Sequence, residues 1–261
     1  VVGAFLIGTG IVLLLAHNWE ALSRAMRVVL SLAPLIVAQL LVGCTIASGK
    51  ESAAWRESTA TFLMLSIGAS IALIGQTYHV PGDLGEFLFA WMILSLPLIY
   101  LRDASFAAIL YMIGITAWAG YTRVEVGVPI FFWVLFGLAV PHILQSAREN
   151  RYAILPTFLM WVACLCLCVA TGFLMEHELP GFWGIVYSAL FAILYLAGNR
   201  WFAEGPSIWQ RPFASVGTLG VAGLSLILTF KWMWEEIRHS DIAWSDLSRS
   251  TSVADVALGG V

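Results

Sequence analysis

Residues 67–83 read IGASIALIGQTYHVPGD, an apolar run that passes directly into a polar segment. Four polar side chains follow one another closely there: Gln76, Tyr78, His79 and Asp83. Side chains before Gln76 suit a hydrocarbon environment, whereas those after it need water or a hydrogen-bonding partner. Such an abrupt change is typical of a transmembrane helix that ends at a membrane boundary. We expect the helix to stop at this change and the Pro81-Gly82 pair to turn the backbone.

The composition of the whole chain indicates a membrane protein. Hydrophobic residues make up 60% of the 261 residues, charged residues make up 11%, and the mean hydropathy is +0.88. A soluble domain with this composition would have too little polar surface to cover itself. Apolar runs of about 17 to 25 residues, long enough to cross a hydrocarbon core of about 30 Å, recur along the chain. They lack the alternation of barrel strands, so the spans are predicted to be helices.

The predicted fold class is all-α, a polytopic transmembrane helical bundle of about nine spans within residues 1–232. The expected spans are 1–16, 28–47, 58–75, 87–101, 104–120, 126–144, 153–174, 182–198 and 213–232. Residues 233–261 are predicted to form an extracytoplasmic amphipathic tail that turns apolar again near its end, where a further span can follow. The chain opens inside an apolar run without an initiator Met, and we interpret it as an excised segment.

Lys and Arg residues are distributed unevenly between alternate loops. The loops after even-numbered spans carry seven of them: Lys50, Arg56, Arg102, Arg148, Arg151, Arg200 and Arg211. The loops after the first, third, fifth and seventh spans carry three: Arg24, Arg27 and Arg123. Because cytoplasmic loops are enriched in positive charge, the first set is predicted to lie in the cytoplasm. The loop formed by residues 76–86 is then predicted to be extracytoplasmic.

A candidate ligand site lies where the first and third spans end on the same predicted side. Its residues are Asn18, Trp19, Glu20, Arg27, Gln76, Tyr78, His79 and Asp83. In one interpretation they line an outward-facing pocket for a polar headgroup or a small solute, with His79 able to titrate near neutrality. In the other they cap helix ends and hydrogen-bond to one another at the rim of the bundle. Sidedness alone pairs Arg27 with Asp83. It also pairs Glu20 with His79.

The same residues carry a resemblance to a known family. Asn18-Trp19-Glu20 follows a Gly-rich apolar span, and Gly75-Gln76-x-Tyr78-His79-x-x-Gly82-Asp83 follows the third span. These patterns resemble the bacterial domain-of-unknown-function family numbered 2157, whose members are predicted multi-spanning inner-membrane proteins. The likeness is clearest over about residues 3–103 and includes Trp91, Pro97 and Leu98. It implies a multi-pass protein of the bacterial inner (plasma) membrane and supplies no chemistry.

Few polar groups interrupt the predicted spans. Gln39 and His142 are the clearest, and apart from Lys231 at the end of the last span the spans contain no Asp, Glu, Lys or Arg, which argues against a simple ion-coupled carrier. Cys44, and Cys164, Cys166 and Cys168 in a second span, are interpreted as small hydrophobes. No His, Asp or Glu lies within that second span to complete a metal site, so we expect no metal and no cofactor.

Small residues recur along two of the predicted spans. They are Gly68, Ala72 and Gly75 in one span and Gly217, Gly220 and Gly223 in another. Small side chains let helix backbones approach closely, so we interpret both sets as packing surfaces.

Three classes of function fit these features. The leading hypothesis is a structural or assembly partner in the cell envelope, and the alternative is a protein that binds or transports a lipid or an envelope precursor. An intramembrane enzyme would use Glu20 or His79 as a general base, but no nucleophile motif or metal spacing accompanies them. The expected partners are membrane lipid and other envelope membrane proteins. Nucleic acid is not expected, because a net charge of -3 and a pI near 5.9 provide no basic face.

Overall fold

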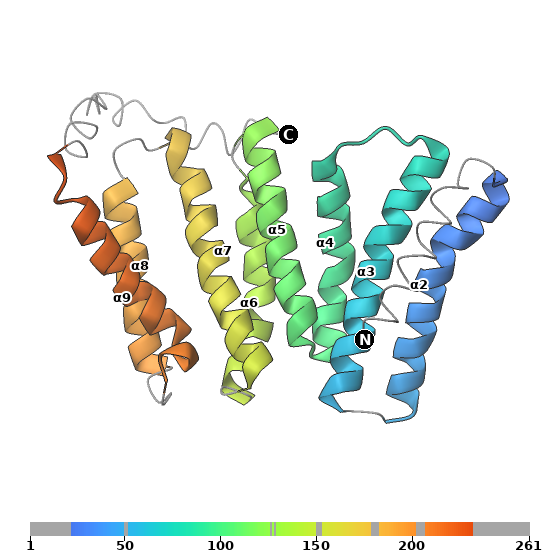
Figure 1. Cartoon of the computed structure of the whole chain (residues 1–261), viewed down its shortest axis with the longest axis horizontal. Coiled ribbons are helices and arrows are strands. Elements are labelled where there is room, and N and C mark those ends of the chain that lie inside the picture. The colour runs from blue at the N-terminus through green and yellow to red at the C-terminus, as the bar shows by residue number, and fades with distance from the viewer. Residues whose placement is uncertain are drawn as a thin grey trace, which may run out of the picture. The chain divides into compact units, whose positions relative to one another are not determined.

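The computed structural model describes residues 22–49, 52–125, 127, 129–149, 153–178, 183–201 and 207–231 (Figure 1). Its helices are α2 (Arg24–Ala47), α3 (Ala53–Tyr78), α4 (Leu84–Arg102), α5 (Ser105–Glu125), α6 (Phe131–Glu149), α7 (Ile154–Glu178), α8 (Trp183–Trp201), the 3-10 helix η2 (Ile208–Gln210) and α9 (Pro212–Ile227). The described residues are therefore all-α, as predicted. The chain divides into two compact units, one comprising 1–125 with 130–159 and the other 126–129 with 160–261.

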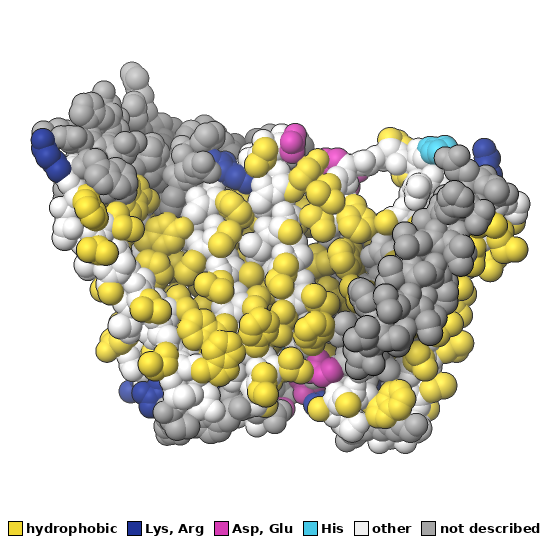
Figure 2. Space-filling model, in the orientation of Figure 1, with side chains coloured by type: hydrophobic (Ala, Val, Ile, Leu, Met, Phe, Trp, Pro, Cys, Tyr) yellow, Lys and Arg dark blue, Asp and Glu magenta, His cyan; other side chains and the backbone are white. Residues whose placement is uncertain are grey.

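The helices confirm a polytopic membrane protein. Among the described residues, five helices are long and apolar enough to cross a membrane, namely α2 to α5 and the Ile154–Phe173 part of α7. Hydrophobic side chains cover the middle of the helices, and charged side chains gather toward their ends (Figure 2). The predicted span at 1–16 and the tail at 233–261 lie outside the described residues, so the count of nine spans stays a prediction.

Local capping moves the start of α2 from the predicted position. The helix begins at Arg24, before the expected start at residue 28, because the Ser23 side chain caps it. Ser23 Oγ accepts a hydrogen bond from the backbone N–H of Met26 at 3.3 Å. Serine is a favoured N-cap because its oxygen satisfies one of the free N–H groups of the first turn.

The first unit is built around α5. Half of the membrane-spanning stretch of α5 is buried, against 22% of that of α2, so α2 is a peripheral helix. α3 packs against α2, α4 and α5, and α5 also packs against α4 and α6. The indole N–H of Trp91 on α4 donates to the carbonyl of Met64 on α3 at 2.8 Å. Trp91 also covers Gly68, where a Cβ atom would lie 2.6 Å from the indole ring.

In the second unit α8 and α9 approach each other closely. A Cβ atom on Gly198 would lie 2.4 Å from the backbone nitrogen of Ala214, and one on Gly217 would lie 2.6 Å from that of Tyr195. Gly220 lies against the ring of Phe191. The packing interpretation is thus confirmed for Gly217 and Gly220, as it is for Gly68. It is wrong for the two remaining glycines, Gly75 and Gly223, because no described residue lies within 4 Å of a Cβ atom at either position.

The cysteines differ in their surroundings. Cys164 is buried beside Leu194 and Val216 in the core of the second unit, which agrees with its interpretation as a small hydrophobe. Cys166 is also buried, whereas Cys44 is exposed on α2.

We expect Gly68→Ala to destabilise the protein, because the added methyl group collides with an indole held in place by its hydrogen bond to Met64. The expected loss is about 1 to 3 kcal/mol, read as a lower melting temperature in detergent. Gly43→Ala is the matched control, because nothing lies within 4 Å of a Cβ atom there and alanine favours the helix. Equal melting temperatures for the two variants would contradict the close α3–α4 contact.

Candidate functional site

The polar segment after α3 shows how that helix ends. α3 continues through Gln76 to Tyr78, so the expected end before Gln76 is wrong. His79 then adopts a left-handed conformation, with φ 50° and ψ 42°. This conformation lets the N–H of Val80 return to the carbonyl of Gly75 at 3.0 Å. His79 therefore ends the helix, ahead of the Pro81-Gly82 pair that was expected to turn the chain.

Asp83 starts the next helix. Its Oδ1 accepts a hydrogen bond from the N–H of Glu86 at 2.8 Å, which is the geometry of an N-cap. The pairing expected from sidedness joined Asp83 to Arg27, whose Nε donates to the carbonyl of Leu22 at 3.1 Å. Both capping roles fit the rim interpretation of the sequence.

The structure describes some of the predicted site residues and not others. Gln76 and Tyr78 are exposed on the last turn of α3, and His79 and Asp83 are exposed on the segment that joins α3 to α4. Asn18, Trp19 and Glu20 lie outside the described residues. The structure thus places half of the candidate set on one short segment, and a ligand-binding role for the set stays a prediction.

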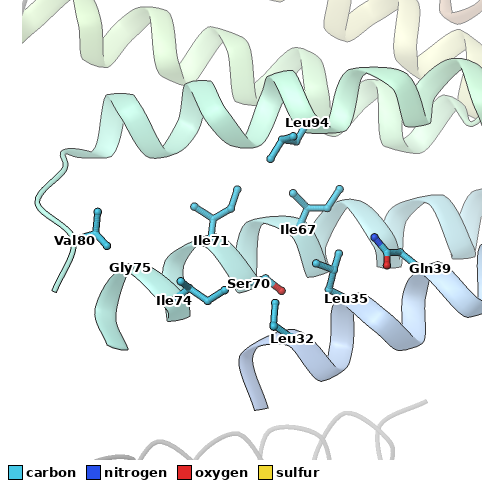
Figure 3. A pocket seen from close by; sticks show the side chains of 10 residues that line it. All are labelled: Leu32, Leu35, Gln39, Ile67, Ser70, Ile71, Ile74, Gly75, Val80 and Leu94. Atoms are coloured by element: carbon cyan, nitrogen blue, oxygen red, sulfur yellow. The ribbon is translucent and has the colours of Figure 1, made fainter. Parts of the chain in front are cut away.

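A groove lies between α2, α3 and α4 of the first unit (Figure 3). Its upper part, next to the polar segment, encloses about 620 Å³. It is lined by Leu32, Leu35, Gln39, Ile67, Ser70, Ile71, Ile74, Gly75, Val80 and Leu94. Figure 3 shows Ile67 and Ile71 of α3 pointing toward Leu94 of α4, with the α2 side chains on the other side. The walls are therefore almost entirely aliphatic.

The groove continues toward the opposite end of the helices. A second cavity of about 660 Å³ shares Gln39, Ile67 and Leu94 with the first. Its remaining lining residues are Leu63, Pro97, Leu98, Tyr100 and Leu101. The shared residues place the two cavities next to each other, and we refer to them together as the upper and lower parts of the groove, whose lining extends from Val80 to Leu101.

Two polar side chains interrupt the aliphatic lining of the upper part. Ser70 Oγ donates to the carbonyl of Ser31 at 2.8 Å and so ties α3 to α2. Gln39 is exposed to the groove, and its amide makes no hydrogen bond within the part of the chain that the structure describes. An amide in an apolar setting gains free energy from any partner that offers a donor or an acceptor.

A charged cluster lies beyond the lower end of the groove, where α2 and α4 end and α3 and α5 begin. Arg56 Nη1 lies 3.3 Å from Asp103 Oδ2, and His142 Nδ1 lies 3.6 Å from Asp103 Oδ1. Glu57 accepts hydrogen bonds from the N–H groups of Ser105 at 2.9 Å and Phe106 at 2.8 Å. Glu57 thereby caps the start of α5 from a different helix.

Only part of this charged cluster was predicted from the sequence. His142 was noted as a polar residue within a predicted span, but its contact with Asp103 was not foreseen. The available signal was the occurrence of Arg56, Glu57 and Asp103 at connections on the same predicted side.

Residues 1–108 match the model of the DUF2157 family, which is described as a predicted membrane protein. The match confirms the resemblance and covers α2, α3 and α4, which form the groove. No curated protein and no solved structure matches the chain. The family description states a membrane location and no activity.

We expect His79→Gly to keep or raise the melting temperature, because glycine adopts a left-handed backbone without steric cost. His79→Val is expected to lower the stability by about 1 to 2 kcal/mol, because a β-branched side chain is strained there. Thermal melts of both variants in detergent test this capping role. If glycine destabilises as much as valine, imidazole contacts and not the backbone conformation hold the segment.

Proposed function

We propose that this protein is a bacterial inner-membrane protein that holds a membrane lipid in the groove between α2, α3 and α4. The observation that carries the proposal is the mainly aliphatic lining of a groove formed by residues 32–39 of α2, 63–75 of α3 and 94–101 of α4. Each part of the groove has a volume within the range of ligand pockets, about 300 to 1,000 Å³.

The chemistry of the lining supports a lipid over a polar solute. Aliphatic walls offer an acyl chain close contacts, and they offer a sugar or an ion almost no hydrogen bonds. The single free amide, on Gln39, is able to contact an ester carbonyl of a lipid. This proposal corresponds to the lipid-binding alternative from the sequence, with the acyl chains placed between helices and not at the exposed polar segment.

A transmembrane helix of another protein is the competing occupant. It corresponds to the assembly role predicted from the sequence, which stays a prediction. A bulky side chain introduced into the groove would displace its occupant, so the two alternatives differ in which bound molecule the purified protein loses. Loss of lipid supports the proposal, whereas loss of a bound polypeptide without loss of lipid opposes it.

We expect Gly75→Leu to reduce the lipid that copurifies with the protein several-fold. Gly75 lines the groove, no described residue lies within 4 Å of its Cβ position, and a leucine there would enter the space of an acyl chain. The measurement is native mass spectrometry after detergent exchange, beside a thermal melt. Gly137→Leu is the matched control, because Gly137 is an exposed helical glycine of α6 with equally open surroundings. A folded Gly75→Leu variant with unchanged lipid content would rule out the groove as a lipid site.

We also propose that the segment between α3 and α4 lies outside the cytoplasm. The arginine-bearing connections lie at the other ends of these helices, which supports this orientation. In a variant with all native cysteines replaced, Leu84→Cys is expected to react with a membrane-impermeant thiol reagent in intact cells. Ser48→Cys is expected to react only after permeabilisation. Both positions are exposed, and the opposite labelling pattern would reverse the orientation.

A further inference from the structure

An arginine is buried at the lower end of the groove without a hydrogen-bond partner in the part of the chain that the structure describes. Arg102 is the last residue of α4 and is 7% exposed. Its Nε and Nη2 atoms are buried and have no hydrogen-bond partner among the described residues. Arginine stays protonated in proteins, so this is a buried positive charge with unused donors. Such a charge is costly unless an anion accepts from it.

The carboxylates of Asp103 and Glu57 interact with groups other than Arg102. Asp103 faces Arg56 on one oxygen and His142 on the other. Both oxygens of Glu57 accept backbone N–H groups from the start of α5. The acidic groups of the cluster are therefore engaged elsewhere, and Arg56 also has a buried Nε atom without a partner.

Both arginines line one cavity of about 350 Å³. The other lining residues are Thr45, Ile46, Gly49, Leu101 and Asp103. With two arginines and one aspartate, the lining has a net positive charge. Arginine guanidinium groups match the geometry of phosphate oxygens and often bind them through two parallel hydrogen bonds.

The cavity adjoins the apolar groove. Leu101 lines both the cavity with the arginines and the lower part of the groove. A ligand that spans the two would present an anion to Arg102 and an acyl chain to α2, α3 and α4. That combination is the chemistry of a phospholipid.

We propose that Arg102 and Arg56 bind the phosphate of an anionic phospholipid whose acyl chains occupy the groove. The proposal rests on the lipid-binding function proposed above and adds the headgroup class and its position. The phosphate lies at the end of the groove opposite to Gln76 and His79. The exposed polar segment, which the sequence favoured as the headgroup site, is then not needed to bind it.

The test compares two lipids with the same acyl chains, dioleoyl phosphatidylglycerol and dioleoylglycerol, added to the purified protein in detergent. Binding is measured by native mass spectrometry and by the shift in melting temperature. Arg102→Gln is expected to weaken phosphatidylglycerol binding about tenfold or more, because charge-assisted hydrogen bonds are lost, and to leave dioleoylglycerol binding unchanged. Arg102→Lys should recover part of the affinity. Arg148→Gln, which removes an exposed arginine at the end of α6, should have no effect.

Wild-type affinity of a folded Arg102→Gln variant for phosphatidylglycerol would overturn the proposal. If that variant does not fold, Arg56→Gln carries the same comparison. A third arm uses inorganic phosphate against chloride at equal ionic strength. If phosphate alone protects the wild-type protein as strongly as the phospholipid does, the cavity binds free phosphate and the lipid assignment is wrong.

The same variants separate this proposal from the function on which it rests. If Gly75→Leu loses lipid but Arg102→Gln binds phosphatidylglycerol normally, the groove binds lipid and Arg102 does not bind the headgroup. Loss of affinity in Arg102→Gln with normal lipid content in Gly75→Leu would show an anion site without a lipid groove, which overturns the phospholipid.

Discussion

The structure depends on one constraint, which is that backbone N–H and C=O groups inside a membrane must find their partners within the protein. Helices meet this constraint, and the small polar side chains on them follow the same rule. The hydroxyl groups of Ser31, Thr77 and Thr116 each donate to the carbonyl four residues earlier in their own helix. The donors of these hydroxyls are therefore satisfied within their own helices. Polar groups that do not follow the rule, such as the amide of Gln39 and the guanidinium of Arg102, therefore mark places where a ligand can act.

Much of the fold could be predicted from the apolar runs of the sequence. Each predicted span from residue 28 onward overlaps a helix of the structure, because the length and hydropathy of a run are local properties. The ends were less predictable. α2 starts early because of the side chain of Ser23, and α3 ends late because His79 enters a left-handed conformation. Few residues other than glycine take that conformation, and although histidine does so more often than most, its identity alone is a weak sign of a helix end.

The candidate site was harder to predict for a different reason. Glu57 and Ser105 are 48 residues apart in sequence and meet through one hydrogen bond. The groove likewise takes its lining from three helices, so no single segment carries its pattern. Gln39 and His142 could be singled out because polar residues are rare in membrane spans. Their places, in the groove and beside Asp103, depend on how the helices pack.

The described side-chain hydrogen bonds of the first unit are unevenly distributed over the walls of the groove. α3 is joined to α4 by Trp91, and to the beginning of α5 by the two oxygens of Glu57. α2 is joined to α3 by the Ser70–Ser31 hydrogen bond and is the more exposed helix. Separating α2 from α3 therefore breaks fewer of the described hydrogen bonds than separating α3 from α4 and α5. The wall of the groove formed by α3 and α4 is therefore cross-linked by side-chain hydrogen bonds, whereas α2 is held against α3 mainly by close helix packing.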